Sequence, residues 1–169
     1  TIESYRPALE IGARLGGKAA LTLNLFTKNS DEAAKQLEQF AQIAGGYGLS
    51  VLLEPVSIGE THNLAQGRDL IRDAGVDVGL LVDILHLMRI GGAVEDLQAI
   101  EPELIRYVQL CDGPANCQPD NLITESIAER LLPGEGVFPL KNFISACPNH
   151  ATFAVEAPSL SRLERGVLP

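Results

Sequence analysis

The chain has 169 residues, 46% of them hydrophobic, and carries 13 basic against 22 acidic side chains for a net charge of −9. This balance argues against a nucleic-acid partner, since proteins that bind polyanions usually carry basic patches. No segment approaches the roughly 18 apolar residues of a membrane span, and the polar start does not resemble a signal peptide, so we expect a cytoplasmic protein with a sizeable core.

The first part of the chain predicts alternating helices and strands. Residues 2–15 have a helical pattern, and residues 20–25 can form a strand. Asn29 is a favoured residue for the start of a helix, which apolar spacing extends to Gly45. A short apolar run then predicts a buried strand that ends at Glu54.

The alternation continues through the rest of the chain. The later expected elements are a helix over 63–74, a strand over 78–83, short helices over 84–90 and 93–99, a strand over 107–112, a helix near 140–146 and a strand over 152–156. Between the last two strands lies the long stretch 113–136, for which we expect one short helix around 123–131. Loops of this length in a compact domain are usually functional or disordered.

The spacing of the predicted strands indicates the fold class. Their centres lie about 30 to 45 residues apart, the spacing of right-handed βαβ units. We therefore predict one α/β domain over residues 1–169, the C-terminal part of a (β/α)8 TIM barrel that lacks its first strands. The strand at 20–25 should then lie at an exposed edge. An open five-stranded parallel sheet is the structural alternative.

Four of these strands close on an acidic side chain, at Glu54, Asp83, Asp112 and Glu156. In parallel α/β proteins the carboxyl ends of the strands meet at one rim, where such enzymes carry out their chemistry. Crowded carboxylates repel one another and normally share a cation or a proton. The pattern therefore predicts an enzyme with a metal-dependent site.

Several short motifs give the chain a family resemblance. In order, they are Leu53-Glu54-Pro55, Asp83-Ile84-Leu85-His86, Val108-Gln109-Leu110-Cys111-Asp112-Gly113, Pro133-Gly134-Glu135-Gly136 and Val155-Glu156. Together they resemble the sugar phosphate isomerase/epimerase family with the xylose-isomerase-like barrel, over about residues 8–160. The resemblance is to a superfamily and does not specify a substrate.

The resemblance implies one divalent metal at the mouth of the barrel. The family's four ligands correspond here to Glu54, Asp83, Gln109 and Glu156, with glutamine where the family has histidine. An amide oxygen suits Mg²⁺ or Mn²⁺ better than Zn²⁺. Weaker metal binding, or a site without metal, is the alternative that this departure leaves open.

The resemblance also implies roles in catalysis. A hydroxy-ketone would lose a proton beside its carbonyl, and Glu54 and Glu156 would remove and return that proton. His86 would hold a substrate hydroxyl or oxyanion. The partner would be a small carbohydrate, with a homo-oligomer left open. The reaction expected is that of a sugar (phosphate) isomerase or epimerase.

Other interpretations of these residues remain. Asp83 is also a favoured helix N-cap. Asp112 is out of phase with Gln109 and Cys111 along its strand, so we expect it to organise the following loop. Residues 133–136 predict a turn before the last helix.

Two other functions remain open. One is an inositol-type dehydratase of the same superfamily. The second is a degenerate barrel that binds a sugar-like ligand without turnover. Apurinic endonucleases, which also belong to the superfamily, need a basic DNA track that the net charge of −9 disfavours.

Overall fold

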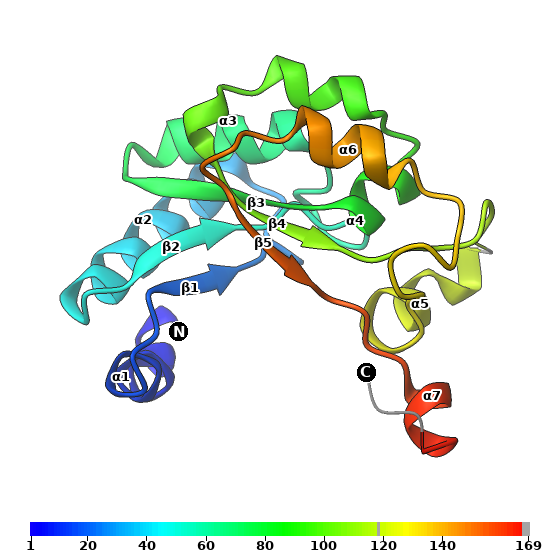
Figure 1. Cartoon of the computed structure of the whole chain (residues 1–169). Helices are drawn as coiled ribbons and strands as arrows, with labels where there is room; N and C mark the ends of the chain where they lie inside the picture. The colour runs from blue at the N-terminus through cyan, green and yellow to red at the C-terminus, as the bar shows by residue number, and fades with distance from the viewer. Residues whose placement is uncertain (118, 167–169) are drawn as a thin grey trace.

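The computed structural model describes residues 1–117 and 119–166 of the chain. Five parallel strands form one sheet in sequence order: β1 (Ala19–Thr22), β2 (Ser50–Leu53), β3 (Val78–Asp83), β4 (Ile105–Leu110) and β5 (Thr152–Val155). The sheet curls like part of a barrel wall (Figure 1). The predicted order and parallel direction of the strands are confirmed, and β1 is an edge strand of the described sheet, as expected.

Helices connect the strands and cover the sheet. They are α1 (Arg6–Arg14), α2 (Ser30–Gly46), α3 (Leu64–Ala74), α4 (Ile84–Arg89), α5 (Leu122–Ala128), α6 (Leu140–Ala146) and α7 (Leu160–Glu164), with 3₁₀ turns at Ile2–Tyr5, Val94–Ala99, Pro102–Leu104 and Pro119–Asn121. In Figure 1, α2, α3 and α6 lie on one side of the sheet. No helix in the described ranges is long and apolar enough to cross a bilayer.

Side-chain caps explain where the two longest helices begin. The Asn29 side chain accepts a hydrogen bond from the Glu32 backbone N–H at 2.8 Å, and Asn63 accepts one from Gln66 at 2.9 Å. These bonds satisfy backbone donors that a helix start leaves unpaired. Gly75 ends α3 with φ of 64°, a conformation that favours glycine.

The two faces of the sheet have different environments. Val51, Leu53, Leu80 and Val82 join the core that packs under the helices. Because successive strand residues point to opposite faces, the intervening positions face the concave side of the sheet. The carboxylate of Asp83 therefore belongs to the concave face, which positions the candidate site.

The first strand is shorter than predicted. It ends at Thr22, whereas we expected strand over 20–25. The Asn24 side chain accepts from the Thr27 backbone N–H and donates to the Thr27 carbonyl oxygen, both at 3.0 Å. This Asx-type turn bends the chain away from the sheet.

The helix expected over 123–131 is also shorter, and this difference affects the site. The helix α5 ends at Ala128. The residues that follow form backbone hydrogen bonds with two other segments of the chain. The backbone of Leu131 pairs with Asp112, and Arg130 N–H donates to the Pro158 carbonyl at 2.9 Å. This bridging places Arg130 among the strand ends.

Candidate metal and active site

Three of the predicted residues converge at the carboxyl ends of β2 and β3. Glu54 directly follows β2, Asp83 ends β3, and His86 lies in the first turns of α4. One potential ligand atom from each lies within 4.8 Å of the others. Their exposed fractions are 5%, 2% and 4%, so these polar groups are withdrawn from solvent.

Asp83 caps the helix that follows it and also pairs with a buried arginine. Its Oδ1 accepts a hydrogen bond from the Leu85 backbone N–H at 2.8 Å, which confirms the helix-capping interpretation. Its Oδ2 lies 2.5 Å from Nη1 of Arg130. The Cys111 thiol lies 4.0 Å from Oδ1 and donates weakly to it. Metal binding by Asp83 stays a prediction.

Burial sets the electrostatics of the two acids. It raises the pKa of Glu54 to about 8, with further contributions from the negative charges of Asp83 and Glu156. Burial also raises the pKa of Asp83 to about 6, while Arg130 acts in the opposite direction. A carboxyl with a raised pKa in a polar cluster is typical of acid–base or metal sites.

Gln109 lies beside this cluster. It is the register partner of Asp83 in the neighbouring strand, so both side chains lie on the same face. Its Oε1 is buried and has no hydrogen-bond partner among the described residues. An unpaired buried acceptor costs on the order of 1–3 kcal/mol. A cation at this point would satisfy it, so the side chains present fit a divalent metal.

Arg130 connects Glu156 to the cluster, and sequence reasoning missed it. Its Nη1 lies 2.9 Å from Oε2 of Glu156 as well as close to Asp83. The arginine is 4% exposed, whereas the Glu156 side chain is 42% exposed. No strand-end signal marks Arg130, since it reaches the site from the segment after α5 through the pairing of Leu131 with Asp112.

The His86 ring is held from the side opposite Glu54. Ser57, in the loop after β2, contacts Nδ1 through its backbone N–H at 3.2 Å and its hydroxyl at 2.9 Å. On the other side, Nε2 lies 3.8 Å from Oε1 of Glu54. Burial lowers the pKa of His86 to about 3, helped by the charge of Arg130, so the ring is neutral at ordinary pH.

Asp112 organises the following loop, as predicted. Its carboxylate accepts backbone hydrogen bonds from Gly113 at 2.9 Å, Gly134 at 3.0 Å and Phe138 at 2.9 Å. These bonds hold the turn over residues 133–136 against the end of β4. A Cβ atom on Gly136 would lie 2.3 Å from Oδ1 of Asp112 and from the Gly113 carbonyl oxygen, so only glycine fits there.

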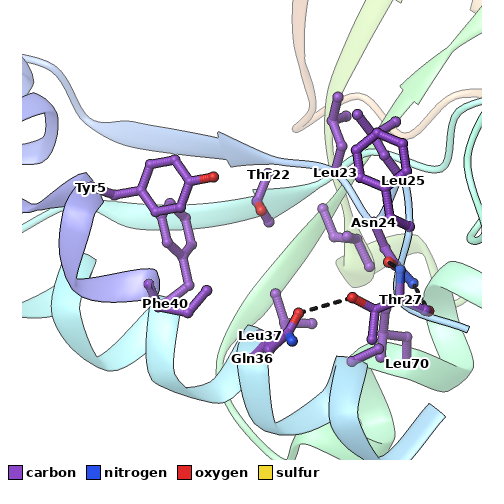
Figure 2. Close-up of a pocket in the computed structure, with 14 residues that line it drawn as sticks. Tyr5, Thr22, Leu23, Asn24, Leu25, Thr27, Gln36, Leu37, Phe40 and Leu70 are labelled. Atoms are coloured by element: carbon purple, nitrogen blue, oxygen red, sulfur yellow. Dashed lines mark hydrogen bonds between the residues drawn. The ribbon is translucent and has the colours of Figure 1, made fainter. Parts of the chain in front are cut away.

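A separate hollow of about 240 Å³ lies beside β1, between the N-terminal segment and α2 (Figure 2). Apolar side chains such as Leu37 and Phe40 line much of it, and the ring of Tyr5 packs edge-on against Phe40 with centroids 5.8 Å apart. Its lining includes none of the predicted site residues and no carboxylate. The convergent polar groups, and not this hollow, therefore identify the candidate site.

Comparison with known proteins identifies related folds and one related sequence. A family model described as xylose isomerase-like TIM barrel matches residues 1–154. A 3-dehydroshikimate dehydratase of Pseudomonas aeruginosa is 30% identical over 114 residues, which are 66% of this chain and 18% of that protein.

Two solved structures illustrate the shared fold. The IolI protein, solved with a bound zinc atom, superposes with a TM-score of 0.78 at 19% identity, covering 96% of this chain and 62% of its own. An L-ribulose 3-epimerase superposes with a TM-score of 0.72 at 18% identity, covering 94% and 54%. At this identity the likeness establishes the fold.

Proposed function

Because this chain belongs to the xylose isomerase-like TIM barrel family, we propose that it catalyses metal-dependent removal of a proton beside a carbonyl group. The reaction that the site supports best is dehydration of a small hydroxy-ketone that carries a carboxylate. The buried guanidinium of Arg130 carries this choice.

The proposed cation ligands are Glu54, Asp83, Gln109 and Glu156. Two observations support this set: Oε1 of Gln109 has no hydrogen-bond partner within the described residues, and Glu54 and Asp83 approach each other closely. Four oxygen donors favour Mg²⁺ or Mn²⁺, whereas the zinc in IolI makes Zn²⁺ the alternative that metal analysis must test. When bound, such a cation acts as a Lewis acid that stabilises negative charge on the carbonyl oxygen.

The two glutamates supply the proton chemistry. One of Glu54 and Glu156 takes the proton from the carbon beside the carbonyl, and the electrons of that C–H bond form a C=C bond. The C–O bond to the hydroxyl on the next carbon breaks, and hydroxide leaves as water with a proton from the other glutamate. His86 holds the substrate oxygen on which charge develops.

Arg130 favours an anionic substrate over a neutral sugar. Its guanidinium forms ion pairs with both Asp83 and Glu156. A cation held by the same carboxylates would take over that role and leave the arginine available to another anion. Arginine binds carboxylates in paired, geometrically matched hydrogen bonds. The sequence similarity to a dehydratase whose named substrate, 3-dehydroshikimate, is a carboxylate also supports an anionic substrate.

Isomerisation or epimerisation of a sugar or sugar phosphate is the second candidate. The pair of glutamates supports it, because returning the proton to the neighbouring carbon or the opposite face needs the same groups. The fold shared with L-ribulose 3-epimerase is consistent with this chemistry.

One experiment separates these functions. The full chain, loaded with Mn²⁺, is incubated in D₂O with 3-dehydroshikimate and with a panel of ketoses, and products are followed by mass spectrometry. We expect loss of one water from 3-dehydroshikimate, abolished by EDTA. Deuterium uptake into a ketose without water loss would instead establish the isomerase or epimerase. Ligand binding without either change would establish a degenerate binding barrel.

A further inference from the structure

Ser57 approaches the His86 ring with two groups at one ring nitrogen. Its backbone N–H lies 3.2 Å and its hydroxyl oxygen 2.9 Å from Nδ1. A backbone N–H can only donate, so Nδ1 must accept and cannot carry a proton. The hydroxyl, which can rotate, then donates to the same lone pair. A neutral imidazole that accepts at Nδ1 carries its proton on Nε2.

The loop that carries Ser57 is firmly held. The backbone of Val56 bonds to the carbonyl of Thr61 at 3.0 Å and accepts from Gly59 at 2.8 Å. The Asn24 side chain donates to the buried Thr61 hydroxyl at 3.1 Å. A Cβ on Gly59 would lie 2.8 Å from the Asn24 carbonyl oxygen, so the two loops pack closely. Ser57 is thus presented to His86 by a fixed backbone.

The opposite ring nitrogen faces the candidate site. Nε2 lies 3.8 Å from Oε1 of Glu54, longer than a hydrogen bond. The proton on Nε2 therefore points toward the carboxylates without being taken up by Glu54. A substrate oxygen bound beside Glu54 is the acceptor that this donor fits. A ring nitrogen that carries a proton has no lone pair for a metal.

We infer that Ser57 is a positioning residue that holds His86 with its proton on Nε2, so that the ring donates a hydrogen bond to the substrate oxygen and does not ligate the cation. This inference rests on the proposed function for the identity of the acceptor. Of the three neighbouring residues Glu54, Asp83 and His86, the first two are then metal ligands and His86 is a hydrogen-bond donor.

The tautomer is measured directly, without substrate. Long-range ¹H–¹⁵N spectra of the full, metal-free chain, labelled at histidine nitrogen, report which ring nitrogen carries the proton. His86→Gln assigns the signal, and the exposed His62 and His150 serve as internal references. We expect a protonated Nε2 and a bare Nδ1 for His86. A proton on Nδ1 would overturn the inference.

Metal titration tests the second half of the inference. The probe is Mn²⁺ alone, measured by calorimetry on the wild type, His86→Gln and Asp83→Asn. We expect His86→Gln to change the Mn²⁺ dissociation constant by less than about 3-fold and Asp83→Asn to raise it by at least about 10-fold. An equal loss in the two variants would make His86 a ligand and overturn the inference.

Serine variants test the positioning role. Ser57→Ala removes the hydroxyl but keeps the backbone donor, so turnover of 3-dehydroshikimate should fall about 3- to 10-fold in kcat, with a shifted Nδ1 signal. Ser57→Thr should restore both, and Ser50→Ala, whose hydroxyl bonds Lys18 away from the site, should change neither. If the ¹⁵N chemical shift of His86 Nδ1 is the same in Ser57→Ala as in the wild type, Ser57 is not a positioning residue. If no variant or wild type turns over this substrate, the proposed function fails, while the spectra and the Mn²⁺ titration still decide the tautomer.

Discussion

The guanidinium of Arg130 lies 2.5 Å from the Asp83 carboxylate although the two residues are 47 positions apart in the chain. Both side chains are almost fully buried, at 4% and 0% side-chain exposure. The pair offsets the cost of burying either charge alone. The same arginine stands beside carboxylates that we assign to a cation, so arginine and metal should compete for them.

Arg130→Met should therefore tighten metal binding in the absence of substrate. Removing a positive charge beside Asp83 and Glu156 should lower the Mn²⁺ dissociation constant by about 10-fold or more, measured by calorimetry. The KM for a carboxylated substrate should rise by about 10- to 100-fold. Arg106→Met, which removes a surface partner of Asp77, is the matched control. Unchanged Mn²⁺ affinity would contradict the competition.

Glu156→Gln should separate proton transfer from metal binding. The amide keeps a ligand oxygen and nearly the same volume but cannot accept a proton. If Glu156 belongs to the acid–base pair, kcat should fall by at least about 10²-fold while Mn²⁺ binding survives. Glu10→Gln, on the exposed side of α1, should leave kcat unchanged. Turnover at the parent rate with metal bound would rule out the two-glutamate mechanism.

Gln109→His should change metal preference. Imidazole is a softer ligand than an amide oxygen, so the variant should gain affinity for Zn²⁺ relative to Mg²⁺. Gln109→Leu removes the unpaired Oε1 and should weaken Mn²⁺ binding while raising the stability of the metal-free protein. Competition titrations with Zn²⁺, Mg²⁺ and Mn²⁺ measure the three affinities, and urea unfolding in EDTA measures the stability of the metal-free Gln109→Leu variant. If neither variant alters any of the three affinities, Gln109 is not a ligand.

The metal-free protein should lose stability as the pH rises from about 6.5 to about 8. Below this range two further shifts overlap with that of Glu54: the lowered pKa of His86 makes stability increase with pH up to about 6.5, and the pKa of Asp83 is raised to about 6. Glu54 has its pKa raised to about 8 from 4.5, so the folded protein binds this proton more tightly than the unfolded chain does. The stabilisation is complete below the unfolded pKa and is lost as the pH rises through the folded one, with a slope of up to about 1.4 kcal/mol per pH unit. Urea unfolding in EDTA measures it. Glu54→Gln should flatten this slope, and an equally steep slope in the variant would exclude Glu54 as its source.

Gly136→Ala should destabilise the loop that Asp112 organises. The added methyl group would collide with Oδ1 of Asp112 and the Gly113 backbone, at a cost of about 1–3 kcal/mol in the free energy of unfolding. Gly45→Ala, at an exposed position of α2 with open space around it, should raise stability by about 0.5–1 kcal/mol. Urea unfolding measures the stability of each variant relative to the wild type. A Gly136→Ala variant as stable as the wild type would show that the turn accommodates the methyl group without cost.

The fold was largely predictable because its signals are local. Apolar runs mark buried strands, and caps such as Asn29 and Gly75 mark helix ends. The strand-end rule also brought Glu54 and Asp83 to one rim. Neither the local signals nor the strand-end rule predicts which loop residues contact the strand ends.

Arg130 and Ser57 were missed for that reason. Arg130 reaches the site through a bridge between Leu131 and Asp112, and Ser57 through a loop held by Asn24. These are long-range contacts between irregular segments, for which a single sequence carries no periodic signal. The role of Asp112 could be predicted, because strand alternation already pointed its side chain away from the concave face.

The order of the strands also bears on how the protein folds. Neighbouring parallel strands are joined by whole helical crossovers, and about 100 residues separate Glu54 from Glu156. Closing such long loops before their contacts form makes parallel sheets slow to assemble. The four proposed cation ligands come together only after β5 has paired with β4. A cation would then bind after the folding barrier has been crossed and would prolong the lifetime of the native state by slowing its unfolding.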